Sequence, residues 1–263
     1  MAEMKWSEAV ELLQLHVVRI ATPQATGTGF LISNARNNAV CGIATAAHVV
    51  DHAHYWEEPI RVEHVMSGKS VVVRRDDRAV FIDSTKDTAA LLLNRGDIPF
   101  PADPLPLAPK AKFLKVGNKI GWLGFPALQG ANLCFFSGDI SAWLQAQTAY
   151  LVDGVAINGV SGGPAFHLID AQPPSVAIIG VVSAYMPNRA TGDVLPGLSV
   201  VRDVSQFHDL APTFATLDQA REAEPPPDAP PQPTEPDKAS DPATPPNKAL
   251  QRTSAPNRKS ARR

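Results

Sequence analysis

The sequence is poor in cysteine and has no long hydrophobic run, and each lack excludes a class of protein. Cys41 and Cys134 are the only cysteines among 263 residues, so a disulfide scaffold is excluded, and we expect two free, buried thiols. No apolar run approaches the ~20 residues that a membrane-spanning helix needs. The first twenty residues contain three glutamates and no uninterrupted apolar stretch, which is not typical of a secretory signal. We therefore expect a cytoplasmic protein.

A strong charge of either sign is also lacking. The 24 basic and 26 acidic residues give a formal net charge of −2. This balance provides no field that would attract nucleic acid or an anionic membrane, so we expect neither as a partner. Hydrophobic residues make up 44% of the chain, which is enough to bury the core of one sizeable domain.

The composition changes abruptly after residue 217. Eleven of the 25 prolines follow this point, and the last aromatic residue is Phe214. Residues 218–246 hold seven acids and two bases, whereas residues 247–263 hold six bases and no acid. Such a segment buries too little apolar surface to fold. We predict a folded domain over 1–217 and a disordered, proline-rich tail over 218–263, whose polyproline stretches could recruit a protein partner.

The folded part is predicted to be all-β. From His16 onward, short β-branched runs alternate with Gly, Pro, Asn and Asp turns, a spacing typical of an antiparallel barrel or sandwich. The clearest runs are Val17 to Ile20, Thr28 to Ile32, Val71 to Arg74 and Ala89 to Leu93. Ahead of them, residues 7–14 are predicted to form a short helix with Ser7 as its N-cap.

The run Gly159-Val160-Ser161-Gly162-Gly163-Pro164 places one serine among glycines. Glycines can turn backbone amides toward one point, and two amides aimed at a developing oxyanion stabilise a tetrahedral intermediate by several kcal/mol. The amides of Gly159 and Ser161 are the natural pair for this oxyanion hole. Glycine also supplies positive φ in any tight loop, so the run alone leaves both interpretations open.

Two upstream segments favour the catalytic interpretation. His48 follows the small residues Thr45, Ala46 and Ala47, and Asp87 begins an apolar run that is expected to be a strand. With Ser161, their order along the chain is histidine, aspartate, serine. In this order the three segments resemble the trypsin-like (chymotrypsin-fold) serine peptidases.

Six further segments extend the resemblance over most of residues 10–210 and are similar to bacterial and HtrA-like members. They are Gly27–Ser33, Gly121–Pro126, Ser137–Ala142, Asp153–Asn158, Gly180–Ser183 and Pro196–Val200. The resemblance implies a peptidase domain. We expect no PDZ-like module after it, and in this the sequence departs from the HtrA proteins. The fold of the peptidase domain would be two six-stranded antiparallel β-barrels, joined near Pro101 to Pro109, with the active site between them.

The resemblance also implies a mechanism. Ser161 would attack the scissile carbonyl, His48 would accept its proton, and Asp87 would orient the imidazole. The chain would be a serine endopeptidase that forms an acyl-enzyme on a polypeptide substrate and needs no cofactor. Two alternatives remain open: an inactive peptide-binding module of the same fold, and a serine hydrolase of small esters or amides.

The resemblance places the substrate pocket at Val155, Ser183, Tyr185 and Gly197. Val155 lies six residues before the serine, where relatives that cut after Lys or Arg carry an aspartate. We therefore expect the substrate residue before the cleaved bond to be small or medium and apolar, and not basic. Ser183 is expected to donate a hydrogen bond to Asp87. Val160 replaces the carboxylate that pairs with a new N-terminus in digestive relatives, so we expect no zymogen switch of that type.

Other titratable residues are weaker candidates than His48 and Asp87. Asp83 lies four residues before Asp87, but only Asp87 is followed by the small and apolar run that the family has after its aspartate. His52, His54 and His64 lie near His48 in sequence. No cysteine pair or carboxylate pair at ligand spacing supports them, so we expect no metal site.

Overall fold

A computed structural model describes residues 4–35, 39–127, 132–188, 195–210, 213, 214 and 216, with the backbone alone for 184–188 and 195–197. The chain divides into two units, Met1–Glu224 and Pro225–Arg263. Every described residue belongs to the first unit, and the predicted tail over 218–263 lies outside the described residues. Among the described helices, none is long and apolar enough to cross a membrane.

The first half of the chain forms one antiparallel sheet. Its strands are β1 (Val17–Ala21), β2 (Thr26–Asn34), β3 (Val40–Thr45), β4 (Ile60–His64), β5 (Lys69–Val73), β6 (Arg78–Asp83) and β7 (Thr88–Asn94). They lie in the order β5-β4-β1-β2-β3-β7-β6, so β5 and β6 are the two edges. The register follows the apolar pattern; Val17 lies opposite Phe30, for example, and both are buried.

This sheet differs from the predicted six-stranded barrel in two respects. It has seven strands, and in the described part of the chain its edge strands β5 and β6 are not paired. The 3-10 turn η3 (Arg75–Asp77) leads from the end of β5 to Arg78, the first residue of β6. Its guanidinium Nη1 donates to the carbonyl of Val73, the last residue of β5, at 3.0 Å. Where the end of β5 meets the start of β6, the contact in the described part of the chain is this side-chain bond and not a backbone ladder.

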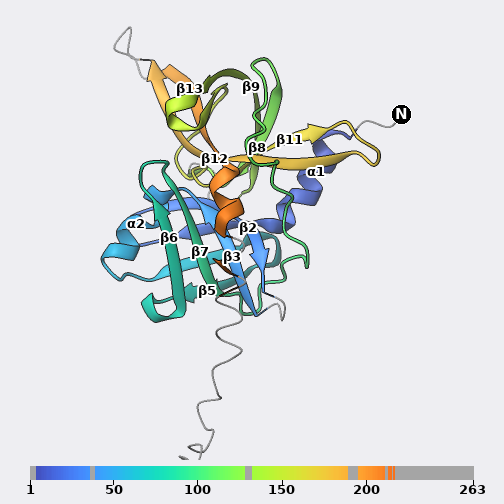
Figure 1. The fold of residues 1–263 in the computed structure, drawn as a ribbon. Coiled ribbons are helices and arrows are strands. Elements are labelled where there is room, and N and C mark those ends of the chain that lie inside the picture. Colours follow the sequence, from blue (N-terminus) through green and yellow to red (C-terminus); the bar gives the residue numbers. More distant parts are fainter. Residues whose placement is uncertain are drawn as a thin grey trace, which may run out of the picture. The chain divides into compact units, whose positions relative to one another are not determined.

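The second half forms a closed barrel of six strands, as predicted. The strands are β8 (Lys119–Gly124), β9 (Cys134–Leu144), β10 (Ala149–Asp153), β11 (Pro164–Ile169), β12 (Ser175–Asn188) and β13 (Leu195–Asp203). They close in the order β10-β13-β12-β11-β8-β9 (Figure 1). Trp122 and Tyr150 are the largest side chains buried in its core. The trypsin-like, mostly β architecture predicted from the sequence is thus confirmed.

The N-terminal helix α1 (Trp6–Leu13) begins one residue earlier than predicted, and Ser7 is not its cap. The N-cap is Lys5, whose backbone N–H donates to the Glu8 carboxylate at 2.9 Å. Trp6 packs against Phe135 of β9 and Phe166 of β11, with ring centroids 5.6 Å away in each case. These contacts with the second barrel extend the helix to Trp6, while its other end leads into β1 of the first sheet.

The remaining short elements are α2 (Ala47–Tyr55) and the 3-10 turns η1 (Gln14–His16), η2 (Val65–Ser67), η3 (Arg75–Asp77), η5 (Gln145–Gln147) and η6 (Val204–Gln206). The segment between β7 and β8 crosses from the first sheet to the second barrel. There, the Ala108 N–H donates to the carbonyl of Ile178 at 2.7 Å.

Both cysteines are free as predicted, but Cys134 is only partly buried.

Candidate active site

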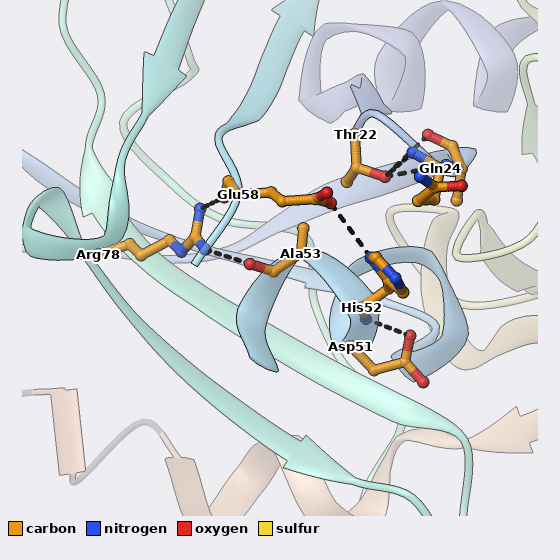
Figure 2. Close-up of polar contacts among 8 residues, drawn as sticks. Thr22, Gln24, Asp51, His52, Ala53, Glu58 and Arg78 are labelled. Carbon is orange, nitrogen blue, oxygen red and sulfur yellow. Dashed lines mark hydrogen bonds and ion pairs between the residues drawn. The ribbon is translucent and has the colours of Figure 1, made fainter. Parts of the chain in front are cut away.

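The helix α2 holds His48 in its first turn, directly after β3. The far end of α2 is fixed by Arg78, whose guanidinium donates to the carbonyls of Ala53 and Glu58 at 2.8 Å each (Figure 2). His52, on the same helix, pairs through Nδ1 with the Glu58 carboxylate at 3.1 Å. These contacts hold the helix against the first sheet and so fix the backbone from which His48 projects.

Asp87 lies in the tight turn between β6 and β7, immediately before β7 begins. Its φ of +49° is in the left-handed region, which aspartate tolerates better than most residues. The turn is held by Asp83, whose Oδ1 accepts hydrogen bonds from the Thr85 N–H, the Thr85 hydroxyl and the Lys86 N–H. Asp83 thus supports the turn and does not contact His48, in agreement with the preference for Asp87.

The imidazole of His48 and the carboxylate of Asp87 are hydrogen-bonded to each other. His48 Nδ1 lies 2.9 Å from Oδ2 and 3.0 Å from Oδ1, and the His48 backbone N–H also donates to Oδ1 at 3.0 Å. Ser183 Oγ donates to Oδ2 at 2.5 Å, as expected from the sequence. The orientation of the ring leaves Nε2 away from the aspartate, on a side chain that is 48% exposed.

The protonation of the pair follows from these contacts. The hydrogen bond from His48 to Asp87 raises the pKa of the histidine above its usual 6.5, although partial burial opposes the shift. Burial acts to raise the pKa of Asp87, but the hydrogen bonds from His48 and Ser183 outweigh it, so this pKa is lowered. The aspartate is therefore an anion that favours an imidazolium beside it.

The loop around Ser161 consists of two successive tight turns that only glycine permits. Gly159 has a φ of +93° and Gly162 a φ of +88°. A Cβ added at Gly159 would lie 2.3 Å from the Phe125 carbonyl oxygen, and one at Gly162 would lie 2.0 Å from the Thr28 carbonyl oxygen. Both the dihedral angles and the close packing of backbone against backbone exclude a side chain at these positions.

The hydrogen bonds of this loop leave two amides free. The carbonyl of the Asn158–Gly159 peptide accepts from the Ala127 N–H at 2.8 Å, and that of the Val160–Ser161 peptide accepts from the Gly163 N–H at 3.0 Å. Because the C=O and N–H of a trans peptide point in opposite directions, the amide of each peptide is turned away from its anchor. Neither amide donates to any residue that the structure describes. These are the two amides predicted for an oxyanion hole.

Ser161 Oγ donates to the Ser183 carbonyl at 3.4 Å. Within the described residues, no hydrogen bond joins this oxygen to His48. Ser183 therefore contacts both halves of the predicted triad, the serine through its carbonyl and the aspartate through its hydroxyl. In enzymes without substrate, catalytic hydrogen bonds are often unformed and tighten only when substrate is bound.

Val160 is fully buried in the apolar core of the second barrel, in the same cluster as Trp122 and Tyr150. The residue that departs from the digestive relatives thus anchors the serine loop by packing and carries no charge.

Sequence reasoning missed Thr28 and Thr45, both buried. The Thr28 N–H donates to the Ser161 carbonyl at 2.7 Å, and Thr45 Oγ1 donates to the Thr28 carbonyl at 2.7 Å.

The predicted substrate pocket is described only in part. Val155 follows β10 and is 41% exposed. Tyr185 of β12 lies opposite Ser199 of β13 in the ladder, but the side chain of Tyr185 and the surroundings of Gly197 lie outside the described residues. The pocket therefore stays a prediction.

Two of the three additional histidines, His52 and His64, have hydrogen-bond partners of their own. His52 is paired with Glu58, and His64 is buried between the hydroxyl of Ser67, 2.8 Å from Nδ1, and the carbonyl of Leu15, 3.1 Å from Nε2. In the part of the chain that the structure describes, no group of three His, Cys, Asp or Glu side chains could hold a metal ion.

Comparison with protein families agrees with this arrangement. The model of the trypsin-like peptidase domain matches residues 27–172, which carry His48, Asp87 and Ser161. The chain belongs to this family. As a trypsin-like peptidase it is a hydrolase, and its family implies a polypeptide substrate.

Solved structures share the fold of this trypsin-like peptidase. Deg5 has a TM-score of 0.56 at 18% identity over 82% of this chain and 98% of its own. A serine endoprotease from Yersinia pestis has a TM-score of 0.58 at 16% identity over 82% of this chain and 68% of its own. The Rv3671c protease in an inactive form has a TM-score of 0.53 at 22% identity over 80% of this chain and 97% of its own. The search of curated proteins gives no match.

Proposed function

We propose that this trypsin-like peptidase is a serine endopeptidase that uses His48, Asp87 and Ser161 and forms an acyl-enzyme. The observation that carries the proposal is the hydrogen-bonded pair of His48 and Asp87 beside a serine loop with two unused amides. A general base held by a carboxylate, a hydroxyl nucleophile and preorganised amide donors are the parts that acyl transfer requires.

The reaction begins with a rotation of the Ser161 side chain. Its hydroxyl leaves the Ser183 carbonyl and turns to His48 Nε2, the nitrogen that does not face Asp87. As Oγ attacks the scissile carbonyl, its proton passes to Nε2, and Asp87 stabilises the resulting imidazolium. The oxyanion of the tetrahedral intermediate accepts hydrogen bonds from the amides of Gly159 and Ser161.

The second half of the reaction regenerates the enzyme. The imidazolium of His48 gives its proton to the leaving amine, which departs with the C-terminal part of the substrate and leaves an ester on Ser161. A water molecule then loses a proton to Nε2 and attacks this ester, and the proton returns to Ser161 Oγ when the acid product leaves. The residue before the cleaved bond is expected to be small or medium and apolar, since Val155 offers no charge.

A peptide-library digest tests the proposal. The wild type is compared with Ser161→Ala and His48→Ala, and new termini are identified by mass spectrometry. We expect cleavage by the wild type only. A wild type that hydrolyses small esters but no peptide would favour the ester hydrolase, and one that binds peptides without cleaving any substrate would favour the inactive module; either result contradicts the proposal.

A further inference from the structure

We propose that Thr28 is a positioning residue of the oxyanion hole, acting through its hydroxyl on the backbone of the serine loop. The inference rests on the proposed function and adds a residue from the opposite half of the fold. Thr28 lies in β2 of the first sheet, 131 residues before the loop that it contacts, and is 0% exposed. All of its polar atoms make hydrogen bonds across the junction of the two halves or to the neighbouring β3.

The hydroxyl of Thr28 makes two of these bonds. It donates to the Gly159 carbonyl at 2.8 Å and accepts from the Phe125 N–H at 3.0 Å. The backbone N–H of Thr28 donates to the Ser161 carbonyl at 2.7 Å. A single residue therefore fixes the peptides on both sides of Val160–Ser161 and ties them to the end of β8.

The peptide held by the hydroxyl occupies a special place in the loop. It is Gly159–Val160, which lies between the two peptides whose amides are free to bind an oxyanion. A rotation of this middle peptide changes ψ of Gly159 and φ of Val160, and so changes the angle between the two free amides. The middle peptide is held at both ends, because its N–H donates to the Ile157 carbonyl at 3.0 Å and its carbonyl accepts from the Thr28 hydroxyl at 2.8 Å. Without the hydroxyl the peptide keeps only the bond at its N–H and can rotate further, so the hydroxyl helps to keep both free amides directed as the structure has them.

Among the four donors that hold the carbonyls of the serine loop, the Thr28 hydroxyl is the one that belongs to a side chain. The carbonyls of four successive residues, 158 to 161, are each held by a hydrogen bond. Three of the four donors are backbone amides, of Ala127, Gly163 and Thr28 itself. Only the Thr28 hydroxyl is a side-chain donor, so a substitution can remove this restraint and leave the other three in place.

Substitution by valine isolates the hydroxyl. Valine keeps the branched shape of threonine but cannot donate to the Gly159 carbonyl or accept from the Phe125 N–H. A misplacement of catalytic groups by about 1 Å costs on the order of 100-fold in rate, and the loss of one oxyanion donor costs about 100- to 1,000-fold. For a donor that is loosened but still present, we expect Thr28→Val to lower kcat about 10- to 100-fold. KM should change little, because the oxyanion exists only in the transition state.

The experiment measures kcat and KM on a cleaved peptide, the affinity for a peptide aldehyde, and thermal unfolding for a set of variants. Thr28→Ser keeps the hydroxyl and should restore kcat. Thr28→Ala also lacks the hydroxyl and replaces the valine variant in the comparison if that variant does not fold. Tyr150→Phe is the matched control. It removes a hydroxyl that accepts the Leu114 N–H at 3.2 Å in the core of the second barrel. We expect it to lower the unfolding temperature and leave kcat near that of the wild type.

The outcomes separate this inference from the proposed function. A kcat within threefold of the wild type in both hydroxyl-free variants, or an equal loss of kcat in Tyr150→Phe, overturns the positioning role. Failure of the wild type to react with a fluorophosphonate contradicts the proposed function instead. In that case the amide NMR signals of Gly159 and Ser161 test whether the Thr28 hydroxyl positions the loop. We expect these signals to shift or broaden in Thr28→Val, and unchanged signals overturn the inference.

Discussion

Asp87→Asn tests in detail how the Asp87 carboxylate orients the His48 ring. The Asp87 carboxylate accepts from three donors: Oδ1 faces the His48 backbone N–H, and Oδ2 faces Ser183 Oγ, with the ring Nδ1 between the two oxygens. An asparagine has one acceptor oxygen and one NH₂ donor. If the NH₂ group occupied the place of Oδ1, it would face the His48 backbone N–H, and two donors cannot form a hydrogen bond with each other. The oxygen therefore takes the place of Oδ1, and the NH₂ takes that of Oδ2.

This orientation inverts the tautomer of the histidine. The NH₂ group now donates to His48 Nδ1, so the ring proton moves to Nε2, the nitrogen that has to accept the proton of Ser161. Loss of the correct tautomer in a triad lowers kcat about 10⁴-fold, which corresponds to about 5 kcal/mol of transition-state stabilisation. We expect a loss of that size, with the fold intact, since the asparagine occupies the same volume.

The assay is kcat/KM on a cleaved peptide, with thermal unfolding to verify the fold. Asp83→Asn is the matched control, because it removes the same charge four residues away. Its Oδ1 accepts the hydrogen bonds that hold the turn, and an asparagine retains this oxygen. We expect this variant to keep activity within about tenfold of the wild type, since only an exposed ion pair with Lys86 is lost. An Asp87→Asn variant with more than a tenth of the wild-type activity would refute the reasoning, as would equal losses in both variants.

Three further predictions follow from the same geometry. The kcat/KM of the wild type should rise with pH through a pKa above the usual 6.5 of histidine, because the Asp87 hydrogen bond favours the imidazolium, which cannot act as a base; an acid limb centred below 6.5 in a pH profile would contradict this. Val160→Asp should lower the free energy of unfolding by about 3 kcal/mol or more in a denaturant titration, because it buries a charge without a partner; unchanged stability would show that Val160 is not anchored in the core. Gly162→Ala should abolish reaction with a fluorophosphonate, because its Cβ would lie 2.0 Å from the Thr28 carbonyl oxygen at a φ of +88°; labelling at the wild-type rate would be inconsistent with the turn.

The contacts that the sequence could predict are those carried by motifs with a fixed local structure. Asp87 stands at the start of an apolar run, which is β7, and His48 follows small residues at the start of α2. These patterns place both side chains at the ends of elements. That the two side chains meet, and that Ser183 donates to Asp87, is implied only by the resemblance of the motifs to those of the trypsin-like peptidases. The glycines around Ser161 likewise indicated backbone amides turned away from a regular ladder.

The contacts that the sequence could not predict depend on side chains far apart in the chain. The hydroxyl of Thr28 meets Gly159 across 131 positions, and no local pattern in β2 distinguishes it from an ordinary strand threonine. The edges of the first sheet are joined by a hydrogen bond from the Arg78 side chain to the Val73 carbonyl, and alternating hydrophobicity does not predict this contact. The start of α1 is set by Trp6 and its aromatic neighbours in the second barrel, which outweigh the capping preference of Ser7.

The most direct test of a Ser161 nucleophile is covalent labelling with a fluorophosphonate, followed by mass spectrometry of the modified peptide. The wild type, Ser161→Ala and His48→Ala are treated side by side with a control serine peptidase. We predict that the phosphonyl group is found on Ser161 of the wild type, that Ser161→Ala does not react, and that His48→Ala reacts at least about 10³-fold more slowly. A wild type that stays unlabelled while the control reacts, or a label that persists in Ser161→Ala, would contradict the account.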